Sequence, residues 1–489
     1  MQNSEKITKN YIFNLLYQLL LIISPIVTTP YLARTIFNDG IGLYSYAYSI
    51  ATYFILFGAL GFTYYSQREM AKHKDNMYDS SKLFWEIFIL RIIFVFASLA
   101  IYLPLSVNNI FDNKTIMLIL SIDVISVAFD ITFYFQAKEK FGLIMIISSL
   151  SKITNIVLIF MIVKSSSDVD KYALCQSVFV LLNAIMLWPF LIKKLKFVNV
   201  KELNLLRHLK PVLILFIPTI AISIYRTLDK TLIGIICEGN EENGFYENSE
   251  KIIRVALTII TSLGSVMISR NSNLLKEGQI EKFNNNIFYA LRFVLFLSIP
   301  MIIGVFIVSN DFVPLFFGDG FEPVSNLMKV YSFVFIFVGI SNVIGLQFLV
   351  VCAKDKQYII SIVIGALTNL LLNLWLIRYY GAMGATIATI IAEFIIMALM
   401  LIFTRKEINY LNVVTKSFKY FISGGVLIVI GIIMHYFMPH TTILLFVRVI
   451  ISIISYFGVL LLLKDEFVLM MIRFIKSKVL KDRGKKYDN

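Results

Sequence analysis

Apolar stretches of about 20 residues alternate with short polar breaks along almost the whole chain. A helix of about 20 residues, rising 1.5 Å per residue, is long enough to cross the hydrocarbon core of a bilayer. The pattern therefore predicts membrane-spanning helices. We place fourteen spans, at 11–35, 41–65, 83–105, 115–136, 142–163, 172–192, 212–236, 245–269, 287–309, 326–351, 358–378, 382–403, 420–437 and 443–463.

The composition agrees with a membrane protein. Hydrophobic residues make up 58% of the chain and charged residues only 16%, whereas soluble domains contain about 45–50% and about 25%. The three cysteines form no CxxC pair, and the four histidines form no HExxH motif. The cysteines therefore exclude a disulfide framework and a thiolate metal site as the main feature of the chain, and we expect no metal or cofactor.

The basic residues show on which side of the membrane each loop lies. Of the 45 Lys and Arg residues, 31 fall in loops on the N-terminal side, 4 in loops on the opposite side and 10 within spans. By the positive-inside rule, this predicts a multi-pass protein of the bacterial cytoplasmic membrane with both termini in the cytoplasm. The formal charge of +14 therefore reflects topology and not nucleic-acid binding. The first span is too long for a signal-peptide core, so we expect it to be retained.

The two halves of the chain carry similar short motifs in the same order. Residues 42–50 align with 244–252 at an offset of 202, and residues 137–140 align with 353–356. This indicates a repeat of six plus six spans. An even number of spans per repeat gives both halves one orientation, with an axis along the membrane normal and a cavity between them.

The expected fold is an all-α integral membrane protein with about fourteen transmembrane helices. Two six-helix lobes surround a central cavity, and two extra helices follow. The predicted parts are an N-terminal lobe at 1–192, a cytoplasmic linker at 193–210, a C-terminal lobe at 211–403, two extra spans within 404–463 and a basic cytoplasmic tail at 464–489.

One span carries three charges within five residues. The stretch ISIYRTLDKTLIGII, residues 222–236, contains Arg226, Asp229 and Lys230. A charge at the centre of a membrane helix costs at least ~2.5–3.5 kcal/mol on insertion scales, so such residues are rare without a function. Polar stripes on spans one, seven and eight indicate faces that contact protein or water, which we interpret as the walls of one aqueous cavity.

Positive charges outnumber negative ones within the spans, which predicts an anionic ligand. Guanidinium and ammonium groups are the usual binders of phosphate. The candidate binding residues are Arg34, Arg226, Lys230, Lys251 and Arg254 in the outer half of the bilayer, and Arg91 and Lys152 deeper toward its middle.

A purely structural role for the same charges stays open. Helical spacing allows Arg226 to pair with Asp229, Glu247 with Lys251, and Glu250 with Arg254. Two further cations, Lys329 and Arg448, lie near span ends and are expected to snorkel. The remaining carboxylates could be charge partners or could carry a coupling proton or sodium ion; they are Asp123, Asp130, Asp229, Glu250 and Glu393.

These residues resemble a known family. The segments LIISPIVTTPYLARTIF and GIGLYSYAYSIATYF (21–54), FDITFYFQAKEKFGLI (129–144) and GATIATIIAE (384–393) are similar to Wzx-type polysaccharide repeat-unit flippases. This family handles O-antigen and capsule units and belongs to the multidrug/oligosaccharidyl-lipid/polysaccharide exporter superfamily. The resemblance covers about residues 10–405. It departs at Ile36–Asp39, where Leu-Gly is usual, and at Ser269, where Pro is common.

The resemblance implies two six-helix bundles around a cationic cavity and export of an undecaprenyl-diphosphate-linked oligosaccharide by alternating access. Membrane lipids, a coupling H+ or Na+ ion, and a polymerase with its chain-length machinery are the other partners that it implies. The chain has no GxxxxGK[ST] motif, so a secondary transporter is expected and not an ATP-driven pump. A drug or cation antiporter of the same superfamily is the first alternative. A membrane polysaccharide polymerase or ligase is the second.

Overall fold

The computed structural model describes residues 2–73, 76–111, 113–196, 198–262, 264–439, 441–470 and 472. Over these residues the chain is helical and contains no β-strand, and every predicted span coincides with a helix or with consecutive helices. Within this part, ten helical segments are long and apolar enough to cross a membrane. The chain is thus a multi-pass membrane protein with an all-helical fold. Most of the predicted basic tail lies outside the described residues.

The chain forms two compact units. Unit 1 contains residues Met1–Asn248 and Leu370–Ala385, and unit 2 contains Ser249–Asn369 and Thr386–Asn489. Two long helices contribute to both, namely α11 (Glu241–Thr261) and α16 (Asp355–Thr404). The predicted lobe boundaries remain a prediction.

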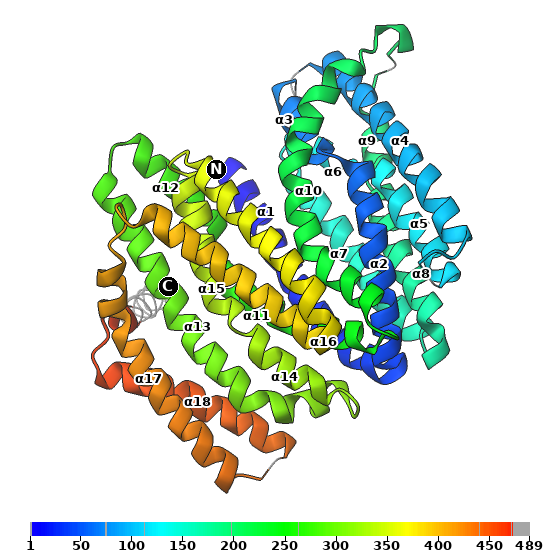
Figure 1. Ribbon diagram of the computed structural model, residues 1–489. Coiled ribbons are helices and arrows are strands. Elements are labelled where there is room, and N and C mark those ends of the chain that lie inside the picture. Colours follow the sequence, from blue (N-terminus) through cyan, green and yellow to red (C-terminus); the bar gives the residue numbers. More distant parts are fainter. Residues whose placement is uncertain are drawn as a thin grey trace, which may run out of the picture. The chain divides into compact units, whose positions relative to one another are not determined.

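Unit 1 is built on a close packing of α5 with α2, α4 and α8 (Figure 1). In addition, α1 packs on α7, and α10 packs on α2. The helices of this unit are α1 (Gln2–Thr35), α2 (Phe37–Ala59), α3 (Phe62–Lys72), α4 (Met77–Val107), α5 (Lys114–Phe129), α6 (Thr132–Ala137), α7 (Phe141–Ile162), α8 (Val169–Ile185), α9 (Trp188–Ile192) and α10 (Leu206–Ile236), with the short turns η1 (Ser166–Asp168) and η2 (Val200–Glu202).

One predicted span of unit 1 is broken near its end. The apolar run 115–136 forms α5 and the short α6, with Asp130 between them. Its Oδ1 accepts a hydrogen bond from the backbone N–H of Thr132 at 2.9 Å. An Asp side chain that bonds to the backbone two residues ahead favours a turn over a continuous helix, which explains the break.

Residues that the repeat predicts to be equivalent lie against each other in unit 1. Gly42 of α2 lies against the backbone of Gly244 of α11, because a Cβ atom at Gly42 would be only 2.7 Å from the Gly244 nitrogen. One turn further on, Ser45 Oγ donates to Glu247 Oε2 at 3.0 Å. The first turns of the two helices therefore pack together at matching positions.

Unit 2 is organised around the long helix α13, which packs against α14, α15, α17 and α18 (Figure 1). The helices that lie wholly in this unit are α12 (Gly264–Lys276), α13 (Ile280–Phe317), α14 (Glu322–Tyr331), α15 (Val334–Asn342), the π-helical segment η3 (Val343–Val350), α17 (Tyr410–Phe437) and α18 (Thr442–Leu462).

Two buried arginines join the C-terminal helices to α13. Arg292 of α13 donates to Asp465 Oδ2 and to the Tyr420 hydroxyl, each at 3.1 Å. Arg448 of α18 pairs with Asp311 of α13 and is only 2% exposed. The expectation that Arg448 snorkels is wrong, because its guanidinium is buried in an ion pair and also donates to a backbone carbonyl, that of Met438.

The helix α16 contains both predicted spans 358–378 and 382–403 and is kinked between them. Gly381 has φ 52° and ψ −131°, a conformation that residues with a Cβ atom rarely adopt. Next to the kink, the backbone N–H of Ala382 donates to Glu242 Oε2 at 2.6 Å. The Glu242 carboxylate of α11 therefore binds the backbone of α16 directly beside the kink.

Candidate functional site

One deeply buried candidate is Asp229, in the charged segment of α10. Its side chain is 4% exposed. The Tyr246 hydroxyl donates to Asp229 Oδ2 at 2.5 Å, and Asn373 Nδ2 donates to Oδ1 at 2.6 Å. These donors belong to α11 and α16, so the carboxylate holds together three helices of unit 1.

Lys230, the next residue, lies in a polar contact between α10 and α11. Its Nζ is 2.5 Å from Glu247 Oε2, which also accepts from Ser45 of α2. The backbone carbonyl of Lys230 accepts from Asn243 Nδ2 at 2.8 Å. Glu247 therefore joins α2, α10 and α11 and neutralises Lys230 in this state.

Arg226 differs from both of its charged neighbours. Its side chain is exposed, and no residue of the described part of the chain accepts a hydrogen bond from it or forms an ion pair with it. The predicted pairing of Arg226 with Asp229 is therefore absent, because Asp229 uses its oxygens for Tyr246 and Asn373. One turn before Lys230, α10 thus presents a guanidinium group that no carboxylate neutralises.

In unit 2 the predicted pair Glu250–Arg254 is formed on α11. Arg254 Nε donates to Glu250 Oε1 at 2.6 Å, and the Tyr331 hydroxyl lies 3.3 Å from the same oxygen. Glu250 is buried, whereas the Arg254 side chain is 43% exposed. Two other candidates of this unit, Lys251 and Glu393, are partly exposed.

The deeper cations lie in unit 1. Arg91 is 2% exposed, donates to the backbone carbonyl of Asp130 and lies 3.9 Å from Asp130 Oδ2. Lys152 of α7 places its Nζ 4.9 Å from the centre of the Phe179 ring, which is a cation–π contact. Arg34 is exposed at the end of α1 and donates to the Pro30 carbonyl at 3.3 Å.

A cavity of about 300 Å³ lies beside Arg91 in unit 1. Its lining is mixed, with apolar side chains and several polar groups. The polar and charged residues around it are Tyr48, Thr63, Arg91, Asp123, Ser126, Asp130, Thr132 and Asn183.

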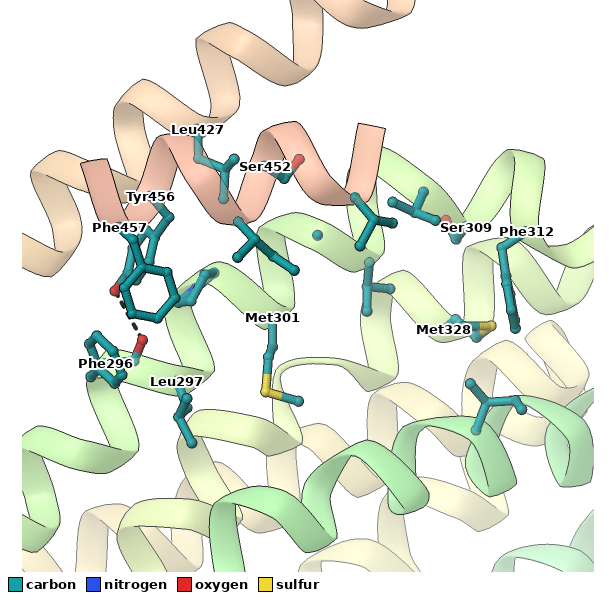
Figure 2. Close-up of a pocket in the computed structure, with 17 residues that line it drawn as sticks. Phe296, Leu297, Met301, Ser309, Phe312, Met328, Leu427, Ser452, Tyr456 and Phe457 are labelled. Carbon is teal, nitrogen blue, oxygen red and sulfur yellow. Dashed lines mark hydrogen bonds between the residues drawn. The ribbon is translucent and has the colours of Figure 1, made fainter. Parts of the chain in front are cut away.

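A second cavity, of about 460 Å³, lies in unit 2 between α13 and the C-terminal helices (Figure 2). Its walls are almost wholly apolar, with Met301 and Phe312 from α13 and Leu427 from α17. The Tyr456 hydroxyl at its edge donates to the Phe296 carbonyl at 2.9 Å, so this polar group is already satisfied. The chamber can hold a hydrocarbon chain and offers almost nothing to a polar ligand.

The sequence reasoning did not find the polar network at one end of unit 1. Glu86 of α4 is fully buried and pairs with Arg207 and with His208 Nε2 of α10, the latter at 2.8 Å. His208 Nδ1 lies 2.6 Å from the Tyr65 hydroxyl of α3. In the sequence, Glu86 was the residue that could have indicated this network, since a carboxylate inside a predicted span needs a partner.

Comparison with known proteins gives one family. The family described as "Polysaccharide biosynthesis protein" matches residues 7–273, which is more than half of the 489 residues. A protein of Escherichia coli (strain K12), named as a proposed O-antigen transporter, is 24% identical over 393 residues. That alignment covers 78% of this chain and 93% of the relative.

Solved structures with the same fold are also transporters. A lipid II flippase, MurJ, in an inward closed conformation superposes with a TM-score of 0.73 at 18% identity, covering 93% of this chain and 99% of the other. An inward-facing multidrug resistance transporter of the MATE family, from the MOP superfamily, gives 0.59 at 11% identity over 80% of this chain and 94% of the other. The fold is therefore that of membrane transporters.

Proposed function

The chain belongs to the polysaccharide biosynthesis protein family and is a transporter and not an enzyme, and we propose that it translocates an undecaprenyl-diphosphate-linked oligosaccharide. In this proposal the repeat unit crosses the cytoplasmic membrane by alternating access, for assembly of a cell-surface polysaccharide. The positive-inside bias supports an orientation with both termini in the cytoplasm. A polymerase on the outer side would consume the exported unit.

The observation that carries the proposal is the exposed guanidinium of Arg226 on an apolar helix. A cation at such a position is costly unless something compensates its charge, and no carboxylate of the described residues pairs with it. A diphosphate at the junction of lipid and sugar supplies the missing anion. A planar guanidinium can bind phosphate oxygens through two parallel hydrogen bonds.

Lys230 and Arg254 are proposed to bind phosphate as well, each within its own unit. Both are neutralised in this structure, by Glu247 and Glu250 respectively. An arriving phosphate would compete with these carboxylates for the cation. The Arg254 side chain is 43% exposed, so a phosphate can approach it without first displacing Glu250.

The apolar cavity of unit 2 supports a substrate with a long hydrocarbon tail. Its volume of about 460 Å³ and its nearly unbroken apolar lining suit an isoprenoid chain and not a sugar. A drug or cation antiporter would need a net acidic binding site, which the unpaired Arg226 disfavours.

Coupling to a gradient is also proposed. Asp229 is the candidate carrier of H+ or Na+ in this part of unit 1, because it is a buried carboxylate that accepts hydrogen bonds from the neutral side chains of Tyr246 and Asn373. A carboxylate held by neutral groups can exchange a proton or a cation without breaking an ion pair with either donor.

The test replaces Arg226 by Ala and by Lys in a strain that lacks the chromosomal copy. The readout is the amount of lipid-linked repeat unit on the cytoplasmic face and the amount of finished polysaccharide outside. Losing a charge-assisted hydrogen bond, worth about 1.5–3 kcal/mol, should slow export about 10- to 100-fold for Ala, and Lys should retain part of the activity. Arg405→Ala, at an exposed position outside the predicted spans, is the matched control. Full export by Arg226→Ala would overturn the proposed role.

A further inference from the structure

Asp123 is a buried carboxylate in the middle of unit 1 that the proposed function does not use. It lies nine residues after Lys114, which begins α5, and so about 14 Å along a helix that rises 1.5 Å per residue. That depth is near the middle of a membrane-spanning segment. Its side chain is 3% exposed.

The contacts of Asp123 are all neutral. Ser177 Oγ of α8 donates to its Oδ2 at 2.5 Å, whereas the Ser126 hydroxyl donates to its backbone carbonyl. No lysine or arginine of the described residues pairs with it.

The titratable groups around Asp123 can be named element by element. Tyr44 and Tyr48 of α2 and Tyr102 of α4 are near enough for the charge of Asp123 to act on their hydroxyl groups. Arg91, also of α4, lines the same cavity but binds Asp130. On α8 the partner of Asp123 is Ser177, whose hydroxyl does not titrate at physiological pH.

Burial without a cationic partner determines the charge state of this group. Burial without a cationic partner disfavours the ionised form of a carboxyl group and so favours uptake of a proton. The protonated acid has one O–H to donate and keeps an oxygen that accepts from Ser177. The geometry at Asp123 therefore suits a neutral carboxylic acid.

The cavity beside Asp123 offers a place from which a proton can arrive. Its volume of about 300 Å³ is large enough to hold water molecules. It is also lined by Arg91, whose buried Nε has no hydrogen-bond partner among the described residues.

We propose that Asp123 is a proton-binding site of unit 1, separate from Asp229, which holds its proton in the conformation described here and exchanges it through the adjoining cavity. The proton binding itself follows from the geometry of unit 1 alone. Only its use in driving export rests on the proposed function.

The test detects the protonated acid directly in the purified full-length protein in liposomes. Infrared difference spectra should show the C=O stretch of a protonated carboxylic acid, and Asp123→Asn should lack this band. An apolar carbodiimide, which reacts with protonated carboxyl groups, should label Asp123 at mildly acidic pH, and the labelling should fall as the pH is raised. Peptide mass spectrometry locates the label.

Two further variants secure the interpretation. Ser177→Ala removes the hydrogen bond but keeps the acid, so the band should persist at a shifted frequency. Asp79→Asn, at an exposed position, should leave both signals unchanged. A wild-type spectrum without the band, or labelling that sodium blocks and high pH does not, would overturn the proposal in favour of an ionised carboxylate or a sodium site. Because neither readout requires export, failure of the flippase proposal would not affect the result.

Discussion

The Tyr246 hydroxyl donates to Asp229 at 2.5 Å and thereby fixes a carboxylate of α10 against α11. Asn373 of α16 donates to the second oxygen. Arg226, about one turn earlier on α10, forms no ion pair with Asp229 among the described residues. The three charges of this segment therefore have separate roles.

We expect Asp229→Asn to lower export about 10- to 100-fold, since hydrogen bonds to a charged acceptor are worth about 1.5–3 kcal/mol. The NH2 group of the new amide is itself a donor, so it would face the donor of either Asn373 or Tyr246 and one hydrogen bond would be lost. Export in cells and the thermal stability of the purified protein check this. Tyr246→Phe is the companion variant. If export by Asp229→Asn depends on pH and on sodium in the same way as export by the wild type, Asp229 has no coupling role.

Gly42→Ala should disrupt the packing of α2 on α11. Its Cβ would lie 1.8 Å from the Asn240 carbonyl oxygen, a distance that forces backbone to move. Overpacking costs typically about 1–3 kcal/mol, so a lower melting temperature is expected. Gly425→Ala is the control, because a Cβ there meets nothing within 4 Å. Equal melting curves for both variants would contradict the close contact.

Arg254→Ala should abolish most export while leaving membrane insertion intact. The exposed part of the side chain is the part available to phosphate, whereas its Nε is held by Glu250. Arg254→Lys keeps the charge but loses the planar donor pair, so we expect intermediate activity. Complementation assays combined with immunoblots of membrane fractions separate lost activity from lost protein.

Lys194 should be unusually reactive toward acylating reagents. A hydrogen bond with Lys140, partial burial and the charges of Lys140 and Lys138 lower the pKa of Lys194 to about 8. The neutral amine is the nucleophile, so near pH 8 about half of Lys194 can react. A lysine with a pKa of about 10.4 is less than ~1% neutral at that pH. Acylation rates for Lys194, with exposed Lys201 as the control, can be measured by mass spectrometry between pH 7 and 9. Equal rates at the two lysines would contradict the lowered pKa.

Gly304→Leu tests the apolar cavity of unit 2. Gly304 lines the chamber, and a Cβ atom there meets nothing within 4 Å. The leucine side chain should fill part of the space and reduce export without destabilising the fold. Gly425→Leu is the control at an open position outside the cavity. Export at the wild-type level by Gly304→Leu would show that the chamber does not hold the lipid tail.

The sequence predicted the features that depend on local patterns. Apolar runs located the spans, and the i, i+4 spacing located the Glu250–Arg254 pair. The partners of Asp229 were missed because Tyr246 and Asn373 lie 17 and 144 residues away. Arg448 was misjudged for the same reason, since Asp311 lies 137 residues earlier and only the packed helices bring the two together.

The ion pair between Arg292 and Asp465 has a consequence for biogenesis. The two residues are 173 positions apart, and a ribosome adds about 5–20 residues per second, so Arg292 waits roughly 9–35 s for its counter-charge after it is made. During that interval its long side chain can reach the headgroup region, because it lies near one end of its predicted span. The helix α13 is therefore inserted in a provisional state. It reaches its final environment only after Asp465 has been made. A truncation that removes Asp465 should therefore destabilise α13, although α13 lies much earlier in the chain.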